Sequence, residues 1–343
     1  MHRLLASFMI VLAGAFVMVS GVLTGCSPAG GRGDTASGSK VILKLGTETA
    51  VGSPETRGAQ KLAELVRKNS NGTLEIEVYE DAKLGTMRER NEGMRSGAID
   101  MGTSSVGFLA SYEPVAGIFD LPYLYTGKAH EMRVFDGEIG REIDRRLREH
   151  GLRVLCYFDA GTRQITNNIR PINTLNDLKG MRLRVPQSEA SIEGFKILGA
   201  TPTPMPFGEV YMGLNKNVVS GQENPVSLIL SNNFYKVQKY LSLTNHQLFM
   251  QVLLVSEKSW RKLSAEQQAI LLTASWEAEV YEREIVAREE VELLSILKEK
   301  GIQVNEVANQ GEFAARAKSL QEIYIKRLGQ PAKDLFEKID ALR

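Results

Sequence analysis

The fold class is indicated by the stretch of residues from Val41 to Tyr79, which reads VILKLGTETAVGSPETRGAQKLAELVRKNSNGTLEIEVY. Its first six residues are typical of a buried strand, and Ser53-Pro54 then offers an N-cap followed by proline at the first helical position. Apolar residues recur at helical spacing over 54–69, Asn71-Gly72 ends the helix, and alternation over 74–78 predicts a second strand. Strand, helix and strand in this order form a βαβ unit, which predicts a parallel pair and an α/β protein.

The α/β alternation continues downstream of this unit. The pattern predicts a helix at about 86–97, a strand near 99–103, a strand at 152–158, a short helix near 175–179, a strand at 182–185 and a helix at 189–198.

The C-terminal third differs, because one uninterrupted helical pattern dominates it. Ser264 to Gln267 reads as a capping box, and neither proline nor glycine follows until Gly301. The pattern predicts one helix of about 37 residues, well beyond the ~8–20 usual in globular proteins. Its apolar period is irregular, which favours a helix packed across two lobes over a coiled coil.

The N-terminus carries an export signal. Arg3 gives a short basic start, an uncharged and largely apolar run extends from Leu4 to Val22, and small residues precede Cys26. This ending resembles the lipobox of bacterial lipoproteins, in which the cysteine is acylated and the chain is cut just before it. A transmembrane anchor is the alternative, since the run approaches the ~20 residues needed to span a bilayer. We expect a lipoprotein signal peptide over 1–25, a lipid on Cys26, a flexible Gly/Ser-rich tether over 26–39 and a soluble, extracytoplasmic remainder.

Charge, cysteine count and motif content exclude several classes of protein. Loss of Arg3 with the signal leaves 41 basic against 41 acidic residues, so no bulk attraction to nucleic acid is expected. Cys156 lies in an apolar run and is expected to be a buried thiol. No histidine pair has metal-ligand spacing, and the chain lacks a G-x-S-x-G elbow, a P-loop and G-x-G-x-x-G. The sequence therefore predicts neither an enzyme nor a metal or cofactor; an exported esterase using Ser104 is the disfavoured alternative.

Unusual features gather between residues 161 and 246. In the strand at 182–185, Arg182 and Arg184 share one face, so one of them is expected to point into a cleft. Closely spaced prolines then fix an extended path that leads to Phe207. The stretches in question are GTRQITNNIRPINTLNDLKGMRLRVP (161–186), LGATPTPMPFGEVY (198–211), GQENP (221–225) and YKVQKYLSLTNH (235–246).

These stretches, in this order, resemble the solute-binding proteins of TRAP transporters, the tripartite ATP-independent periplasmic systems, in the DctP family. Looser matches extend the resemblance to the N-terminal half: KLGTMRE (83–89), SGAIDMGTSS (96–105) and FDLPYLY (119–125). The resemblance implies a two-lobed solute-binding protein of type II-like fold, with hinge strands and a long C-terminal helix spanning both lobes. We expect residues 40–160 mainly in lobe 1, residues 161–250 mainly in lobe 2, and residues 251–343 crossing back between them.

The resemblance also implies the residues that hold the ligand. Arg184 corresponds to the principal carboxylate partner of the family, Arg163 to a second, and Asn224 and Phe207 to further residues of the pocket. A guanidinium suits this role because its planar fork matches a carboxylate with two parallel hydrogen bonds and keeps its charge. His246 ends a matching stretch, and a structural role is favoured for it over ligand contact.

The identity of the ligand is less constrained. Sialic-acid receptors of the family carry Glu and Arg where Ser105 and Phe108 stand here, which argues against sialic acid, and Ser105 is itself a candidate ligand residue. Glu48 follows the first strand, where it could accept hydrogen bonds from ligand hydroxyls and repel a second carboxylate. The alternative is that Glu48 is solvated or paired with Arg57 or Arg88, and Arg88 is itself a candidate ligand residue. A sugar acid such as a uronate or aldonate is favoured; a four-carbon dicarboxylate is the alternative.

The implied partners follow from this assignment. We expect a small organic acid as ligand and the membrane permease subunits of a TRAP transporter as receivers, with no nucleic acid and no cofactor. A monomer is favoured, and a dimer built on the long C-terminal helix is the alternative.

Overall fold

The N-terminal βαβ unit forms as predicted in a computed structural model, which describes residues 40–343. Strand β1 (Val41–Gly46), helix α1 (Pro54–Asn69) and strand β2 (Leu74–Tyr79) follow in this order, and β1 pairs with β2 in parallel. The Ser53 hydroxyl accepts a hydrogen bond of 3.3 Å from a backbone N–H of the first helical turn, which caps α1. The predicted parallel pair is therefore confirmed.

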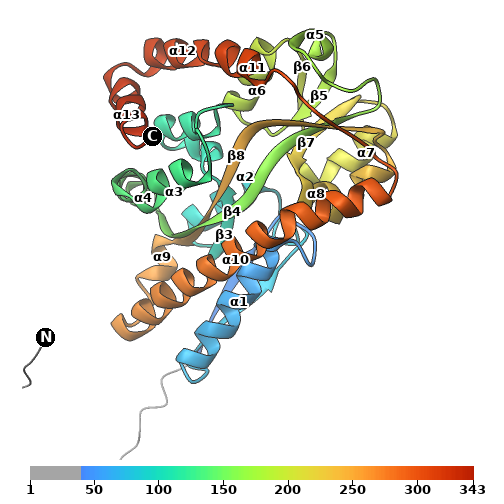
Figure 1. Cartoon of the computed structure of the whole chain (residues 1–343). Coiled ribbons are helices and arrows are strands. Elements are labelled where there is room, and N and C mark those ends of the chain that lie inside the picture. The colour runs from blue at the N-terminus through green and yellow to red at the C-terminus, as the bar shows by residue number, and fades with distance from the viewer. Residues whose placement is uncertain (1–39) are drawn as a thin grey trace, which may run out of the picture. The chain divides into compact units, whose positions relative to one another are not determined.

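The strands form one mixed sheet in the order β2-β1-β3-β8-β4-β7-β5-β6, with β9 beside β8. The other strands are β3 (Met101–Ser105), β4 (Leu152–Asn167), β5 (Arg182–Val185), β6 (Thr201–Pro204), β7 (Gly221–Pro225), β8 (Tyr240–Ser256) and β9 (Gln303–Glu306). β8 runs antiparallel to β3 and β4, and β4 antiparallel to β7, whereas β5 lies parallel to β7 and β6. The long strands β4 and β8, of 16 and 17 residues, thus join a β2-β1-β3 half to a β7-β5-β6 half (Figure 1).

Strand β4 continues well past the end that the sequence predicts. The predicted end at residue 158 is wrong, and Gly161-Thr162-Arg163 lies within the strand rather than after it. Pairing with β8 is interrupted between Asp159 and Thr162 and then resumes. Gly161 has φ +92°, a backbone conformation that glycine adopts without strain, so the strand passes through an irregularity at this residue.

Helices connect the strands and include those predicted from the sequence. The predicted helices at about 86–97 and 189–198 appear as α2 (Met87–Ser96) and α6 (Glu189–Ile197). The remaining helices and 3₁₀ turns are η1 (Gly107–Ser111), η2 (Pro114–Asp120), α3 (Lys128–Asp136), α4 (Glu138–Glu149), α5 (Leu175–Leu178), η3 (Phe207–Glu209), α7 (Val210–Asn215), α8 (Val226–Ser231), η4 (Phe234–Lys236), α9 (Glu257–Trp260), α11 (Gln310–Ala317), α12 (Ser319–Leu328) and α13 (Gln330–Asp340).

The long C-terminal helix is present as α10 (Ala265–Glu299), which has 35 residues. It runs along the molecule beside α1, β4 and α8 (Figure 1), so it contacts elements attached to both halves of the sheet. Its first half contributes Leu271, Ala274 and Ala278 to the core of the β2-β1-β3 half, and its end contributes Leu297 to a separate cluster beneath α7 and α8. The helix therefore spans both halves, as predicted.

The N-terminus of α10 carries the predicted capping box. Ser264 Oγ accepts from the backbone N–H of Gln267 at 3.2 Å, and the Gln267 side chain accepts from the Ser264 N–H at 3.1 Å. We expect Ser264→Ala to lower the free energy of unfolding by about 1 kcal/mol, because the backbone N–H of Gln267 loses its ordered partner. Urea unfolding checks this. Ser295→Ala, at an exposed interior position of the same helix, is the control and should change stability little. Equal losses in both variants would contradict the capping role.

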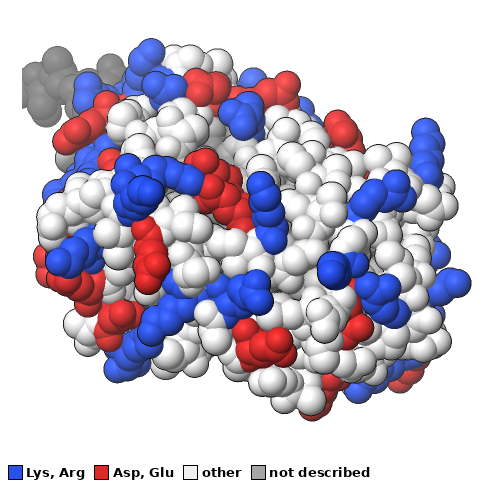
Figure 2. Space-filling view, turned by 90° about the horizontal axis from the view of Figure 1, so that it is seen from above, with Lys and Arg blue, Asp and Glu red and all other residues white. Residues whose placement is uncertain are grey.

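Cys156 is a free cysteine in the core, as predicted. None of the helices between residues 40 and 343 combines the length and apolar character needed to cross a membrane. Figure 2 shows basic and acidic side chains interspersed over the face seen from above, in keeping with the balanced charge of the chain. The expected signal peptide, the lipid site at Cys26 and the tether lie outside the described residues.

Candidate ligand-binding site

The carboxyl ends of several strands meet at one cleft of about 680 Å³. Ser105 ends β3, Arg184 is next to last in β5 and Asn224 is next to last in β7. Ligands of open α/β sheets bind at such edges, outside the carboxyl ends of the strands. The structure places all seven candidate ligand residues on the wall of this cleft: Arg184, Arg163, Asn224, Phe207, Glu48, Ser105 and Arg88.

Arg184 is held rigidly at the wall of the cleft. Its side chain is buried, with 3% of the residue exposed, whereas Arg182 on the same strand is exposed. Nε and Nη2 both donate to the carbonyl of Met205, at 3.0 and 2.6 Å, and the guanidinium lies over the Phe207 ring, 5.9 Å from its centroid. Within residues 40–343, Arg184 Nη1 forms no hydrogen bond. Of the two arginines on this strand, Arg184 is therefore the one that points into the cleft.

The charge of Arg184 survives its burial. Burial is the main cause that lowers the pKa of its guanidinium to about 10; the positive charge of Arg163 acts in the same direction, while Glu223 and Glu48 oppose the shift. The side chain therefore remains protonated at neutral pH. Met205, whose carbonyl orients it, follows the proline-rich strand β6, which pairs with β5 in parallel. The extended path predicted from the prolines thus positions both Met205 and Phe207.

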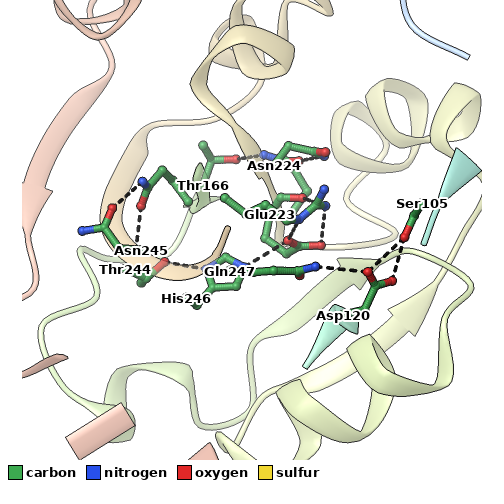
Figure 3. Close-up of polar contacts among 12 residues, drawn as sticks. Ser105, Asp120, Thr166, Glu223, Asn224, Thr244, Asn245, His246 and Gln247 are labelled. Carbon is green, nitrogen blue, oxygen red and sulfur yellow. Dashed lines mark hydrogen bonds and ion pairs between the residues drawn. The ribbon is translucent and has the colours of Figure 1, made fainter. Parts of the chain in front are cut away.

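Arg163 is the centre of a buried ion pair. Nη2 donates to both the carboxylate and the backbone carbonyl of Glu223, each at 2.8 Å, and Nε donates to the other carboxylate oxygen. The guanidinium also lies over the Phe249 ring, 4.4 Å from its centroid. Glu223 additionally accepts from His246 Nε2 at 3.1 Å, and His246 Nδ1 accepts from the Thr244 hydroxyl at 2.8 Å (Figure 3). His246 therefore has the structural role that the sequence favours.

The charge states in this network follow from burial and pairing. Burial alone would raise the pKa of Glu223, but the charge of Arg163 and hydrogen bonds from His246 and Arg163 outweigh it and lower the pKa to about 2. Burial lowers the pKa of His246, although Glu223 opposes this shift. Glu223 is thus ionised and His246 neutral at neutral pH. The Glu223 carboxylate offsets one of the two arginine charges beside the cleft.

Asn224 is fixed by a chain of amide hydrogen bonds. Its Nδ2 donates to Gln222 Oε1 at 2.6 Å, and Gln222 Nε2 donates to the Thr166 hydroxyl at 2.8 Å (Figure 3). Strand β7 pairs with β4 at this level, with Asn224 opposite Gln164. The amide is therefore oriented by the sheet itself.

Glu48 forms neither of the ion pairs that the sequence left open. Arg57 instead pairs with Glu289 on α10 at 2.8 Å, and Arg88 is exposed with its guanidinium 5.5 Å from the centroid of the Phe108 ring. Glu48 accepts from the first backbone N–H of α2 at 3.3 Å, a position that the positive end of a helix favours for an anion. The Glu48 carboxylate thus lies on the cleft wall without a basic partner among the described residues.

Sequence reasoning missed Asp120 and Gln247, both of which line the cleft. The Ser105 hydroxyl donates to the Asp120 carboxylate at 2.8 Å, and the Gln247 amide lies 3.4 Å from the other oxygen (Figure 3). Burial raises the pKa of Asp120 to about 6, although Ser105 and the charge of Arg163 oppose the shift. Asp120 lies inside the FDLPYLY stretch that resembles the family, but no role for it was predicted from that stretch.

The residues of an esterase do not assemble. Ser104 is buried; its hydroxyl accepts from the Asn91 amide at 3.0 Å and donates to the backbone carbonyl of Ser105 at 3.2 Å. No histidine among residues 40–343 bonds to it. In the same part of the chain, no group of three or more His, Cys, Asp or Glu residues is arranged to hold a metal ion. The Ser-His contact that an esterase would need at Ser104 is therefore not formed within residues 40–343.

A family model, a relative of known name and a solved structure that resemble this chain are all solute-binding proteins. The family model DctP, described as bacterial extracellular solute-binding protein, family 7, matches residues 45–327. The 2,3-diketo-L-gulonate-binding periplasmic protein YiaO of Escherichia coli is 33% identical over 310 residues, which cover 90% of this chain and 94% of that protein. The sugar acid binding protein DctPAm of Advenella mimigardefordensis, solved with galactonate, has a TM-score of 0.85 at 30% identity and covers 89% of this chain and 99% of that one.

A relative with a different ligand shares the architecture. A TRAP periplasmic solute-binding protein of Sulfurospirillum deleyianum, solved with bound succinate, has a TM-score of 0.84 at 27% identity and covers 89% of this chain and all of that one. The fold is therefore that of two-lobed TRAP solute-binding proteins, as the sequence resemblance implies. The chain belongs to the DctP family, the bacterial extracellular solute-binding proteins of family 7, and is a TRAP solute-binding protein.

Proposed function

We propose that this receptor captures a sugar acid, such as a uronate or aldonate, and that Arg184 holds the ligand carboxylate. The observation that carries the proposal is a buried, charged guanidinium on the cleft wall whose Nη1 has no partner within residues 40–343. Met205 occupies the Nε side of the fork, so a ligand carboxylate would meet the edge formed by Nη1 and Nη2. Two parallel charge-assisted hydrogen bonds suit that edge.

The remaining candidate residues complete the proposed site. Arg163, already paired with Glu223 through Nε and Nη2, adds positive charge beside Arg184 and is proposed to offer its remaining nitrogen, Nη1, to the ligand. Asn224 offers its side-chain oxygen to a ligand hydroxyl or its amide to the carboxylate. Phe207 provides an apolar face next to Arg184. Arg88, exposed at the mouth of the cleft, contacts the far end of a longer ligand.

An acidic side chain on the cleft wall favours a hydroxylated monocarboxylate over a four-carbon dicarboxylate. The Glu48 carboxylate has no basic partner among residues 40–343, so it repels a second ligand carboxylate and accepts hydrogen bonds from hydroxyls. The ligands named for the two sugar-acid relatives support this reading, and the succinate-bound relative keeps the dicarboxylate as the alternative.

We also propose how the lobes are divided and where the receptor works. Strands β4 and β8 are proposed as the hinge, with lobe 1 over 40–160, lobe 2 over 161–250 and the segment 251–343 crossing back. The pairing irregularity between Asp159 and Thr162 supports a bend near the first boundary. We further propose a monomer, anchored outside the cytoplasm by a lipid on Cys26, which performs no reaction and delivers its ligand to the permease.

Ligand-dependent thermal stability tests the proposed function. We expect galactonate, glucuronate or a related sugar acid to raise the melting temperature of the mature protein, because a ligand at a hundredfold excess over Kd adds about 2.7 kcal/mol to the folded state. Succinate at the same concentration should have a much smaller effect. A shift with succinate alone would replace the sugar acid by the dicarboxylate alternative. No shift with any organic acid would contradict anion capture itself.

A further inference from the structure

Asp120 is a buried carboxyl group that the fold builds into the cleft wall. It ends η2, and only 6% of the residue is exposed, although it lines the cleft. Its side chain lies against the backbone of Gly107, where a Cβ atom would be 2.1 Å from Asp120 Cγ. Any residue other than glycine at 107 would displace the carboxyl group. The position of the Asp120 carboxyl group therefore depends on the glycine at position 107, thirteen residues earlier in the sequence.

The described partners of Asp120 leave part of its accepting capacity unused. A carboxylate presents about four lone-pair positions. The single Ser105 hydroxyl proton is shared between the two oxygens, at 2.8 and 3.0 Å, and the Gln247 amide is a long contact of 3.4 Å (Figure 3). The backbone N–H of Gly107 is a further donor to the carboxylate. Within residues 40–343, no lysine, arginine or histidine forms an ion pair with Asp120, since the guanidinium of nearby Arg163 is directed to Glu223. A buried carboxylate in this state is stabilised by any further donor that the cleft receives.

We propose that Asp120 accepts a hydrogen bond from a hydroxyl group of the ligand and, with Ser105 and Gln247, forms a hydroxyl-binding subsite that determines specificity. This inference rests on the proposed function, in which Arg184 holds the ligand carboxylate. The subsite is distinct from Glu48, which lies after β1 and is fixed by the first N–H of α2.

The charges of the cleft select the chemical class of the donor. An ammonium group would be attracted to Asp120 but repelled by Arg184 and Arg163, which lie on the same cleft. A second carboxylate would be repelled by Asp120 itself. A hydroxyl is a neutral donor and meets neither penalty, and its proton satisfies a buried acceptor that bulk water reaches poorly. A polyhydroxylated monocarboxylate therefore fits both ends of the cleft.

A cycle between protein variants and ligand hydroxyls tests the subsite. Calorimetric titrations at pH 8 would compare the unaltered protein with Asp120→Ala and the isosteric Asp120→Asn, using the best sugar acid of the thermal panel, galactonate first, and its single-deoxy analogues. We expect Asp120→Ala to weaken binding of the full sugar acid at least tenfold. One deoxy analogue should lose a similar factor on the unaltered protein and less than twofold on Asp120→Ala, because the partner of the missing hydroxyl is already gone.

A control variant and the possible contrary results distinguish a failure of the Asp120 subsite from a failure of the proposed function. Asp81→Asn removes the same charge from an exposed position outside the cleft and should leave binding unchanged. If the unaltered protein binds the sugar acid and both Asp120 variants bind it within twofold, the subsite is overturned while the proposed function stands. Equal loss factors for every deoxy analogue on all proteins would likewise overturn it. If the unaltered protein binds no acid of the panel, the proposed function fails.

Discussion

Replacing Arg184 by alanine is expected to abolish most of the affinity for the ligand. Removal of one partner from a desolvated charge pair costs about 2–5 kcal/mol, which corresponds to a loss of roughly thirty-fold to several thousand-fold in Kd. The loss is large because the ligand carboxylate would then enter a buried cleft without its principal counter-charge. Calorimetric titration with galactonate or the best acid of the thermal panel measures it.

The same strand provides the control for this prediction. Arg182 is exposed and donates to the backbone carbonyl of Asn217 at 3.0 Å, so Arg182→Ala removes an arginine two residues away without altering the cleft. Its Kd should change less than threefold. Arg184→Lys keeps the charge but loses the planar fork, and we expect an intermediate loss. Equal affinities for Arg184→Ala and the unaltered protein would refute the role of Arg184.

The second large effect is expected from Glu223→Gln. This variant leaves the buried guanidinium of Arg163 without a counter-charge, and breaking a buried ion pair from one side costs about 3–5 kcal/mol of unfolding free energy. Urea unfolding at pH 7 measures the loss. Glu292→Gln makes the same chemical change at an exposed position of α10 and should cost less than about 0.5 kcal/mol. Similar stabilities of the two variants would show that the ion pair contributes little.

The pH dependence of this difference follows from the lowered pKa of Glu223. The group titrates near 4.5 in an unfolded chain and near 2 in the folded protein, because the charge of Arg163 and the hydrogen bonds from His246 and Arg163 outweigh burial. A carboxylate with a lowered pKa stabilises the folded state above its unfolded pKa and loses that contribution as the pH falls through the folded value. The gap in stability between the unaltered protein and Glu223→Gln should therefore be constant above about pH 5 and narrow from there towards pH 2.

Helices and strands were predicted well where the residues that determine their bounds lie within the element or next to it. β1, α1 and the 182–185 strand have the predicted bounds, because caps, glycine breaks and apolar periodicity lie within each segment. β4 was predicted too short because its continuation past residue 158 depends on pairing with β7 and β8, which are distant in sequence. Strand ends that are set by neighbours in the sheet leave no local signal.

The residues of the site were predicted mainly from motifs that resemble the DctP family. Contacts between residues that are far apart in the sequence were not predicted. Arg163 was identified, but not its pairing with Glu223, 60 residues further along the chain. Asp120 and its contact with Gln247, 127 residues away, were missed for the same reason. Such contacts are created by the sheet order. Lone polar residues in an apolar motif, as in FDLPYLY, are the signal that could have indicated Asp120.

A crystal structure of the protein with a bound sugar acid such as galactonate would show directly whether Arg184 holds the ligand carboxylate. We expect this carboxylate within about 3 Å of the Nη1 and Nη2 atoms of Arg184, with the hydroxylated end directed towards Asp120 and Glu48. A ligand whose carboxylate lies away from Arg184, or one bound outside this cleft, would contradict it.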